Sequence, residues 1–122
     1  MTNYEIAKKY VELIQQGKHE ECLGSLFAKD AISVEAVAMP GMDRTANGLE
    51  AIRSKGEWWA NNHIIHKEEV YGPYPHDNRF AVRFVYDVTN KPSDQRIQMD
   101  EVGLFTIENG KIVREEFFYS QA

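Results

Sequence analysis

The stretch Asp100-Glu-Val-Gly-Leu-Phe-Thr-Ile-Glu-Asn-Gly-Lys-Ile-Val-Arg-Glu-Glu-Phe-Phe-Tyr119 consists of two alternating segments joined by Asn109-Gly110. Asn-Gly is the strongest short-range signal for a two-residue hairpin turn, because both turn positions require positive φ. Such a turn pairs Glu108 with Lys111 and sets the register of every pair beyond it. The expected pairs are Thr106 with Val113, Leu104 with Glu115, Val102 with Phe117, and Asp100 with Tyr119. A sheet face with two carboxylates and a phenol among apolar residues suits the floor of a pocket.

A β-bulge would change this register. If it lay before Gly103, it would shift the strand by one residue and bring Glu101 to the pocket face in place of Asp100. The opposite face of the regular hairpin is apolar for a surface open to water. It would carry Phe105, Ile107, Ile112 and Phe118, mixed with Glu101, Arg114 and Glu116. We therefore expect a second copy of the protein to cover that outer face in a homodimer.

Helical spacing dominates the first part of the chain. Thr2 and Glu5 form a capping box, and apolar residues then recur at helical spacing until Gly17. A shorter second helix carries Cys22, Leu23, Leu26 and Phe27 on one side. A third helix is expected to start at Asn47, after a loop over residues 39–46 that is marked by turn-forming residues.

The second part of the chain changes to the period of β-strands. Strands are predicted at residues 31–37, 63–71, 80–88, 97–107 and 111–119. Helices followed by an antiparallel meander are typical of an α+β fold with helices packed on one face of the sheet. With no linker or repeat in sight, residues 1–122 are expected to form a single domain.

Composition argues against several classes of partner. Fourteen basic and nineteen acidic residues give a net charge of −5, and the Lys and Arg residues do not cluster. Nucleic acid and anionic membrane are therefore not expected as partners. Cys22 is the single cysteine, so an internal disulfide is excluded. Because the chain shows neither a signal peptide nor an apolar stretch long enough to span a membrane, we expect a cytoplasmic protein.

The order of elements resembles the nuclear transport factor two superfamily, a cone of three helices wrapped on a curved sheet. The resemblance covers nearly the whole chain and is carried by Lys9-Tyr-Val-Glu-Leu-Ile14 with Gly17, Phe27-Ala-Lys-Asp-Ala31, and Gly110-Lys-Ile-Val113. Gly48-Leu-Glu-Ala-Ile52 is similar to a helix start in the SnoaL-like branch. These motifs are mostly structural, so they imply the fold rather than a reaction.

Within that superfamily the early segments look most like ketosteroid isomerase. Tyr10-Val-Glu-Leu13 matches the segment that carries the tyrosine of the oxyanion hole, and counting from Asp30-Ala31 places the catalytic base at Glu35. The position of the second oxyanion donor falls on Val102, which cannot donate a hydrogen bond, while Asp100 lies one alternation away. Loss of one such donor costs on the order of a hundredfold in rate. The pocket-lining aromatic residue of the last strand corresponds to Tyr119.

The remaining candidates come from their places in the pattern. Glu115 requires a cation, a wet cavity or the pocket rim, because a buried carboxylate without a partner is very costly. His66 would carry protons, as histidines do in the dehydratases that this fold resembles. Trp58 is expected at the pocket mouth or at a subunit contact, and Phe117 on the pocket floor. His63 and His66 point to opposite faces of a strand, so no metal site is predicted.

These residues together predict a pocket for a small, largely apolar organic molecule. The leading hypothesis is an isomerase, cyclase or dehydratase that moves a proton on a carbonyl compound, with Glu35 as base, Tyr10 as oxyanion donor and Asp100 assisting. Such chemistry needs no cofactor, and the chain has no phosphate-binding loop. The alternative is a non-catalytic ligand-binding or dimerisation module of the same fold.

Overall fold

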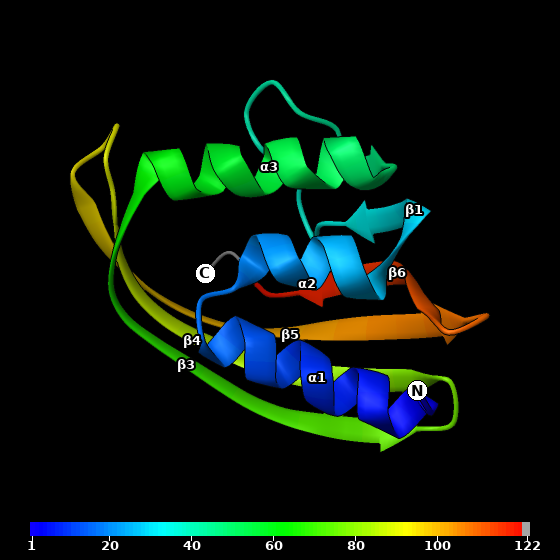
Figure 1. The fold of residues 1–122 in the computed structure, drawn as a ribbon. Helices are drawn as coiled ribbons and strands as arrows, with labels where there is room; N and C mark the ends of the chain where they lie inside the picture. Colours follow the sequence, from blue (N-terminus) through cyan, green and yellow to red (C-terminus); the bar gives the residue numbers. More distant parts are fainter. Residues whose placement is uncertain (121–122) are drawn as a thin grey trace.

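The computed structural model describes residues 1–120, and their order of elements places two strands between the second and third helices (Figure 1). The elements are α1 (Asn3–Gln15), α2 (His19–Leu26), β1 (Phe27–Val34), β2 (Thr45–Asn47), α3 (Leu49–Asn62), β3 (His63–His76), β4 (Arg79–Asn90), β5 (Gln95–Glu108) and β6 (Lys111–Phe118). The three expected helices are present, but they are not all N-terminal to the sheet: β1, expected at residues 31–37, and the short strand β2, which was not expected, precede α3.

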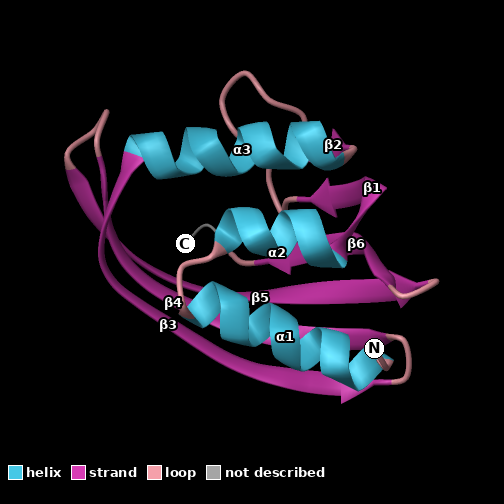
Figure 2. Cartoon of the chain, viewed as in Figure 1, coloured by secondary structure: helices cyan, strands magenta, loops and turns pink. Residues whose placement is uncertain are grey.

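The strands form one curved sheet in the order β2-β1-β6-β5-β4-β3. β1 pairs with β6 in parallel, whereas the other neighbouring strands are antiparallel. Figure 2 shows that β3, β4 and β5 bend around the helices, which lie on the concave side of the sheet. This arrangement confirms the predicted α+β class and the curved, mainly antiparallel sheet.

The two long helices begin in different ways. Thr2 caps α1 through its side chain, and Glu5 reaches back to the Thr2 backbone, so the capping box is confirmed. Asn47, expected as the cap of α3, is instead the last residue of β2. Gly48 takes the cap position with a φ of 92° that favours glycine, and its N–H donates to the Ala31 carbonyl at 2.8 Å. This bond ties the start of α3 to β1.

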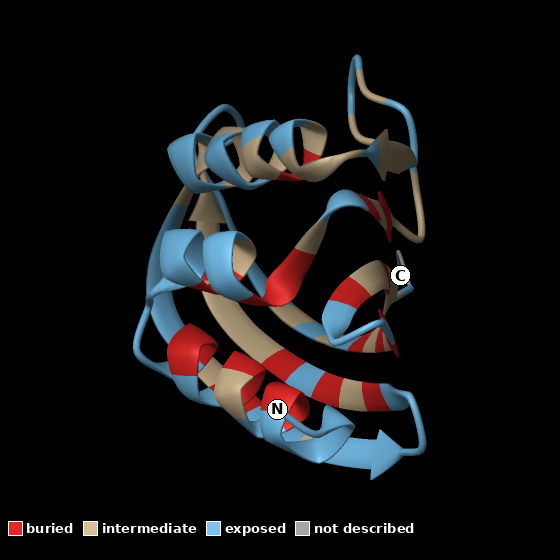
Figure 3. Cartoon of the chain, turned by 45° about the vertical axis from the view of Figure 1, so that its right-hand side comes forward, coloured by how far each residue is buried: buried red, intermediate tan, exposed pale blue. Residues whose placement is uncertain are grey.

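The core lies between α1 and the middle of the sheet. The Tyr10 ring of α1 lies with its centroid 4.4 Å from that of Phe105 and 5.7 Å from that of Phe80. Figure 3 shows buried residues on α1 and along the strands that face it. Aromatic burial of this kind dominates the stability of a small domain, so the Tyr10 ring is part of the packed core.

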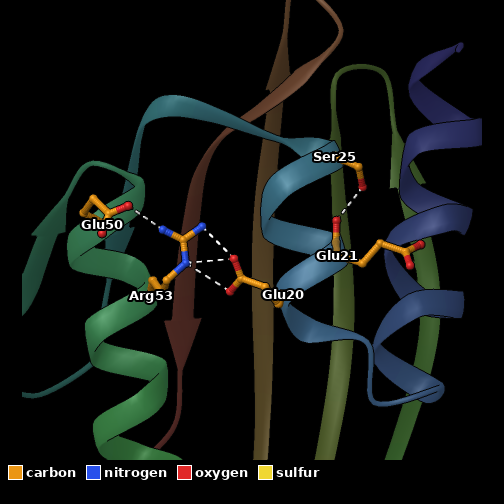
Figure 4. Close-up of polar contacts among 5 residues, drawn as sticks. All are labelled: Glu20, Glu21, Ser25, Glu50 and Arg53. Atoms are coloured by element: carbon orange, nitrogen blue, oxygen red, sulfur yellow. Dashed lines mark hydrogen bonds and ion pairs between the residues drawn. The ribbon is translucent and has the colours of Figure 1, made fainter.

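Arg53 joins α2 to α3 on the outside of the helical layer (Figure 4). Its guanidinium lies 2.8 Å from Glu20 of α2 and 2.5 Å from Glu50 of α3. Within α2, the Ser25 hydroxyl donates to the Glu21 carbonyl. These contacts hold α3 beside α2, so that the opposite side of α3 faces the sheet.

The terminal hairpin has the expected turn but not the expected register. Asn109 and Gly110 both have positive φ, and Glu108 pairs with Lys111. Val113 is then passed over, because Ile107 pairs with Ile112 whereas Thr106 pairs with Arg114. The two strands are thus offset by one residue beyond this β-bulge, and the two faces of β5 exchange sides relative to the regular hairpin.

This bulge decides which side chains face the helices. Glu101, Gly103, Phe105 and Ile107 of β5 share the concave face with Ile112, Glu115 and Phe117 of β6. The expectation for Asp100 and Val102 is wrong, because both lie on the outer face. Glu101 stands in place of Asp100, as in the alternative above, although the bulge is in β6 rather than before Gly103. Phe105, Ile107 and Ile112, expected on the outer face, are buried in the core.

Candidate functional site

A polar cluster lies on the concave face at the end of β1, β5 and β6, beneath α3. Ser33 pairs with Glu115 across the parallel β1–β6 ladder, so both side chains face the helices. Glu35 follows Ser33 by two residues, Glu101 belongs to β5, and the Lys55 side chain extends from α3 toward them. Three carboxyl groups and one ammonium group thus lie among apolar side chains.

A chain of hydrogen bonds runs through Ser33. The Lys55 ammonium donates to Ser33 Oγ, and the Ser33 hydroxyl donates to Glu115 Oε2 at 2.7 Å. Ser33 is fully buried and Glu115 is only 6% exposed. Burial raises the pKa of Glu115, while Lys55 and the Ser33 hydrogen bond act against that rise. Glu115 therefore meets its expected requirement for a cation through Ser33 and Lys55.

Lys55 also pairs with Glu35. Its Nζ lies 3.5 Å from Glu35 Oε2, and each side chain is 13% exposed. That oxygen is buried and has no hydrogen-bond partner, so the contact is ionic. The Lys55 ammonium also lies 5.4 Å from the centroid of the Phe117 ring. Glu35 and Phe117, both predicted from the sequence, are thus brought together at one lysine.

Glu101 is the carboxyl group best suited to exchange protons near neutral pH. It lies opposite Phe84 of β4 on the concave face. Burial, and then the charge of Glu35, raises its pKa to about 7, while Lys55 opposes the rise. A group with such a pKa is present in both its acid and base forms at physiological pH.

Two tyrosine hydroxyls lie near enough to these carboxyl groups to feel their charges. Burial, and then the charge of Glu115, raises the pKa of Tyr10 well above its ordinary value. Burial, and then the charge of Glu35, raises the pKa of Tyr119 to about 12, and the Tyr119 hydroxyl is buried without a hydrogen-bond partner. Both phenols stay protonated at neutral pH and can donate hydrogen bonds.

Three predicted site residues lie outside this cluster. Asp100 is bound on the outer face by Arg83, through two hydrogen bonds of 3.0 and 2.8 Å. His66 sits at an irregularity in β3 and contacts Thr89 Oγ1 at 2.7 Å, on the exposed outer side. Val102 is 38% exposed and pairs with Phe118.

The helical tryptophans divide as their spacing suggests. Trp59 contacts the concave face, with its ring 4.4 Å from that of His63 and 5.6 Å from that of Tyr86. Trp58, the predicted ligand contact, is half-buried and shows no corresponding contact within residues 1–120. Its proposed place at a pocket mouth or a subunit contact remains a prediction.

Lys55 and Ser33 are the principal residues that the sequence analysis missed. A signal for each exists in the pattern. Lys55 lies three residues after Ile52 and four before Trp59, so it occupies the apolar stripe of α3. Ser33 lies midway between Ala31 and Glu35 and shares their strand face by alternation. A lysine on an apolar helical face and a serine on a buried strand face both indicate an internal polar site.

Two open hollows lie apart from the polar cluster. One is bounded by Ile32, Val34, Ala38, Asp43, Arg44, Thr45 and Arg114 near β2. The other is bounded by Ala36, Gln98, Asp100, Phe118, Tyr119 and Ser120 at the end of β6. Neither contains Lys55, Glu101 or Glu115, so the chemistry of the concave face does not coincide with them.

Within residues 1–120, no three His, Cys, Asp or Glu side chains come together as metal ligands. None of the helices in that range has the length and apolar character that a membrane crossing requires.

Residues 1–119 match the family model of the SnoaL-like domain. The chain belongs to the SnoaL-like family. It is also similar to a candidate SnoaL-like polyketide cyclase from Mesorhizobium loti, whose description adds carbohydrate phosphatase. The two are 44% identical over 98% of this chain and 100% of that one, with a TM-score of 0.91.

More distant structures share the fold alone. A candidate SnoaL-like polyketide cyclase from a Jannaschia species is 15% identical, with 95% of this chain and 83% of that one covered and a TM-score of 0.73. A candidate isomerase from Bacillus subtilis is 16% identical, with 98% and 90% covered and a TM-score of 0.74. No curated protein matches this SnoaL-like chain.

Proposed function

We propose that this SnoaL-like protein binds a small, largely apolar carbonyl compound against the concave face and moves a proton on it without a cofactor. The observation that carries the proposal is Glu101, a largely buried carboxyl group with a pKa of about 7 beside the Lys55–Glu35 pair. General acid–base groups work best when their pKa lies near the working pH. The names of the similar cyclases and the isomerase describe reactions of this class.

Room for a ligand is supported by the exposure of concave-face side chains. Phe105 and Val82, under α1, are fully buried. At the α3 end, Ile97 and Ile65 both lie opposite Val88, yet they are 38% and 45% exposed. The helices therefore leave this part of the concave face open to solvent, next to the carboxyl groups.

The proposed roles follow from what each group can donate or accept. Glu101 exchanges the proton with a carbon next to the carbonyl, and Glu35, held by Lys55, is the second carboxyl group available to it. Tyr10 donates a hydrogen bond to the developing oxyanion, because its phenol stays protonated. Lys55 stabilises the same charge. Asp100 has no part, since it lies on the outer face.

Proton exchange into simple ketones tests the proposal without knowledge of the natural substrate. The probes are 1-indanone and 2-tetralone in D2O, with deuterium at the α-carbon followed by NMR. The protein should exchange deuterium faster than buffer. Glu101→Gln, Glu35→Gln and Tyr10→Phe should each lower that rate about a hundredfold, while circular dichroism shows that each variant remains folded. Binding of the ketones with exchange no faster than in buffer would instead favour the non-catalytic ligand-binding module.

We also propose a homodimer through the outer sheet face. The residues that support this dimer differ from those expected from the sequence. Only Phe118, among the apolar residues first assigned to the outer face, lies there. Phe118 is 51% exposed and its partner Val102 is 38% exposed, with the half-buried Leu104 on the same face. These side chains form a small apolar surface on otherwise charged strands, as in many subunit contacts.

A further inference from the structure

The concave face carries more negative charge than positive charge. Glu35, Glu101 and Glu115 lie around Lys55, and Glu68 of β3 adds a fourth carboxyl group on the same face, opposite Tyr86. The Lys55 charge acts on Glu101 and Glu115 and pairs with Glu35, whereas the charge that acts on Glu68 is that of His19 of α2. Lys55 is thus one ammonium group among three of these carboxyl groups.

Two of these acids flank aromatic rings across three neighbouring strands. Glu68 of β3 is the direct partner of Tyr86 in β4, and Glu101 of β5 is the direct partner of Phe84 in β4. Neighbouring strands lie about 4.8 Å apart and two residues span about 7 Å along a strand, so the two backbone positions stand diagonally across β4, roughly 12 Å apart. Both glutamate side chains are long enough to reach a small cation that lies over β4 between them.

The rings between the acids present π-faces to such a cation. Tyr86 and Phe84 stack with centroids 6.1 Å apart, and Trp59 of α3 lies 5.6 Å from Tyr86 on the side of the helices. Ammonium groups bind within about 6 Å of aromatic centroids, and tryptophan and tyrosine are the favoured rings. The half-buried Met99, opposite Tyr86 in β5, completes an apolar border.

Two buried polar groups lie beside the same rings. Tyr10 is only 5% exposed, and the charges of Glu115, Tyr86 and Glu101 act on its hydroxyl. Glu68 Oε1 is buried without a partner. Burial raises the pKa of Glu68 as well, and the charge of His19 partly opposes that rise.

We propose that the ligand of the concave face carries a protonated amine, held between Glu68 and Glu101 over the rings of Tyr86 and Trp59. The ammonium group donates to Glu101 and to the Tyr10 hydroxyl oxygen, while the apolar part of the ligand lies toward Ile65 and Ile97. This inference rests on the proposed function only in assuming that the concave face takes an organic ligand.

Three probes of matched shape and different charge test it: 2-phenylethylammonium, 2-phenylethanol and phenylacetate. Each is titrated into the whole protein at about pH 8, where Glu101 is mostly ionised, with binding followed by NMR and calorimetry. The ammonium probe should bind at least about tenfold more tightly than the alcohol, and phenylacetate most weakly. Equal or tighter binding of either other probe would overturn the proposal, as would absence of ammonium binding up to about 10 mM.

Two variants locate the charge that is responsible. Glu101→Gln and Glu68→Gln should each reduce the preference for ammonium over alcohol at least about threefold while 2-phenylethanol still binds. Glu116→Gln, on the outer face beside Arg114, is the matched control and should leave the preference unchanged. A preference for ammonium that survives in both Glu101→Gln and Glu68→Gln would also overturn the proposal.

The ammonium-binding test and the deuterium-exchange test can succeed or fail independently. Tight ammonium binding without deuterium exchange into ketones leaves this inference standing and rejects the enzyme. Exchange into ketones without a preference for ammonium does the reverse.

Discussion

The Lys55 ammonium lies 3.5 Å from Glu35 Oε2, and it also donates to Ser33, which donates to Glu115. The ammonium group of one helical lysine thus interacts with two carboxyl groups, directly with Glu35 and through Ser33 with Glu115. Because the Lys55 side chain is only 13% exposed, water has little access to solvate these carboxyl groups if the lysine is removed. Its removal tests how far the polar cluster depends on a single charge.

Lys55→Met should destabilise the fold by about 3 kcal/mol, because it leaves buried carboxyl groups without their cation. The measurement is equilibrium urea unfolding at neutral pH. The double variant Lys55→Met/Glu35→Gln should recover part of the loss. Arg83→Met, which breaks an ion pair whose side chains are 49% and 60% exposed on the outer face, is the control and should have little effect. Equal losses in Lys55→Met and Arg83→Met would contradict a special role for the internal pair.

Glu101 should make stability fall as pH rises. Its folded pKa of about 7 lies above the ordinary value of 4.5, so the folded protein keeps a proton that the unfolded chain releases between those pH values. The stabilising contribution of the neutral acid is complete below pH 4.5 and is lost as pH approaches 7. Glu101→Gln should therefore be more stable than the unaltered protein by up to about 3 kcal/mol at high pH, with no such gain in acid. Unfolding at several pH values measures the stability difference, and NMR titration of the carboxyl group measures the pKa. A stability difference between the two proteins that stays constant with pH would contradict a raised pKa of Glu101.

Gly103 should not tolerate a side chain. A Cβ there would lie 2.9 Å from Phe105 Cε1 and 3.1 Å from Phe84 Cε2, inside the packed rings of the concave face. Gly103→Ala should cost about 1–3 kcal/mol through overpacking. Gly24→Ala in α2 is the matched control, since no atom lies within 4 Å of its added Cβ, and it should be neutral or stabilising. Comparable melting temperatures for both variants would show that the rings can move apart.

Phe118→Glu should convert the proposed homodimer into a folded monomer, because it buries a charge in the outer apolar surface. Sedimentation velocity at micromolar protein gives the oligomeric state, and circular dichroism checks the fold. Tyr4→Glu on α1 replaces another exposed aromatic residue, 53% exposed, and should leave the dimer intact. A monomeric unaltered protein would reject the dimer itself.

Local sequence signals made most of the architecture predictable, whereas one bulged residue, Val113, made part of the site prediction wrong. The Asn109-Gly110 turn and the alternation of the strands are sequence-local signals, and both are confirmed. The bulge at Val113 has no such local signal; it allows both Ile112 and Glu115, which are three residues apart, to face the concave side. Its single-residue offset places Glu101, rather than Asp100, on the concave face. Glu35, Glu115 and Phe117 were placed correctly despite it, since they lie beyond or outside the offset.

Lys55 was missed for a different reason. A lysine in a helix is ordinarily solvated, so only its place on the stripe of Ile52 and Trp59 indicates burial. The contact that makes it important comes from Ser33 and Glu115, which are 82 residues apart and meet through parallel pairing. Pairings of that range leave no trace in a local pattern.

The parallel ladder between β1 and β6 also constrains the order of assembly. Ser33 and its neighbour Glu115 are 82 residues apart in the sequence, so the acidic centre cannot close until β6 has been synthesised. Until then β1 has only the three-residue strand β2 beside it, with one edge unpaired. Loss of the β5–β6 hairpin would remove Glu101, Glu115 and the parallel partner of β1 together.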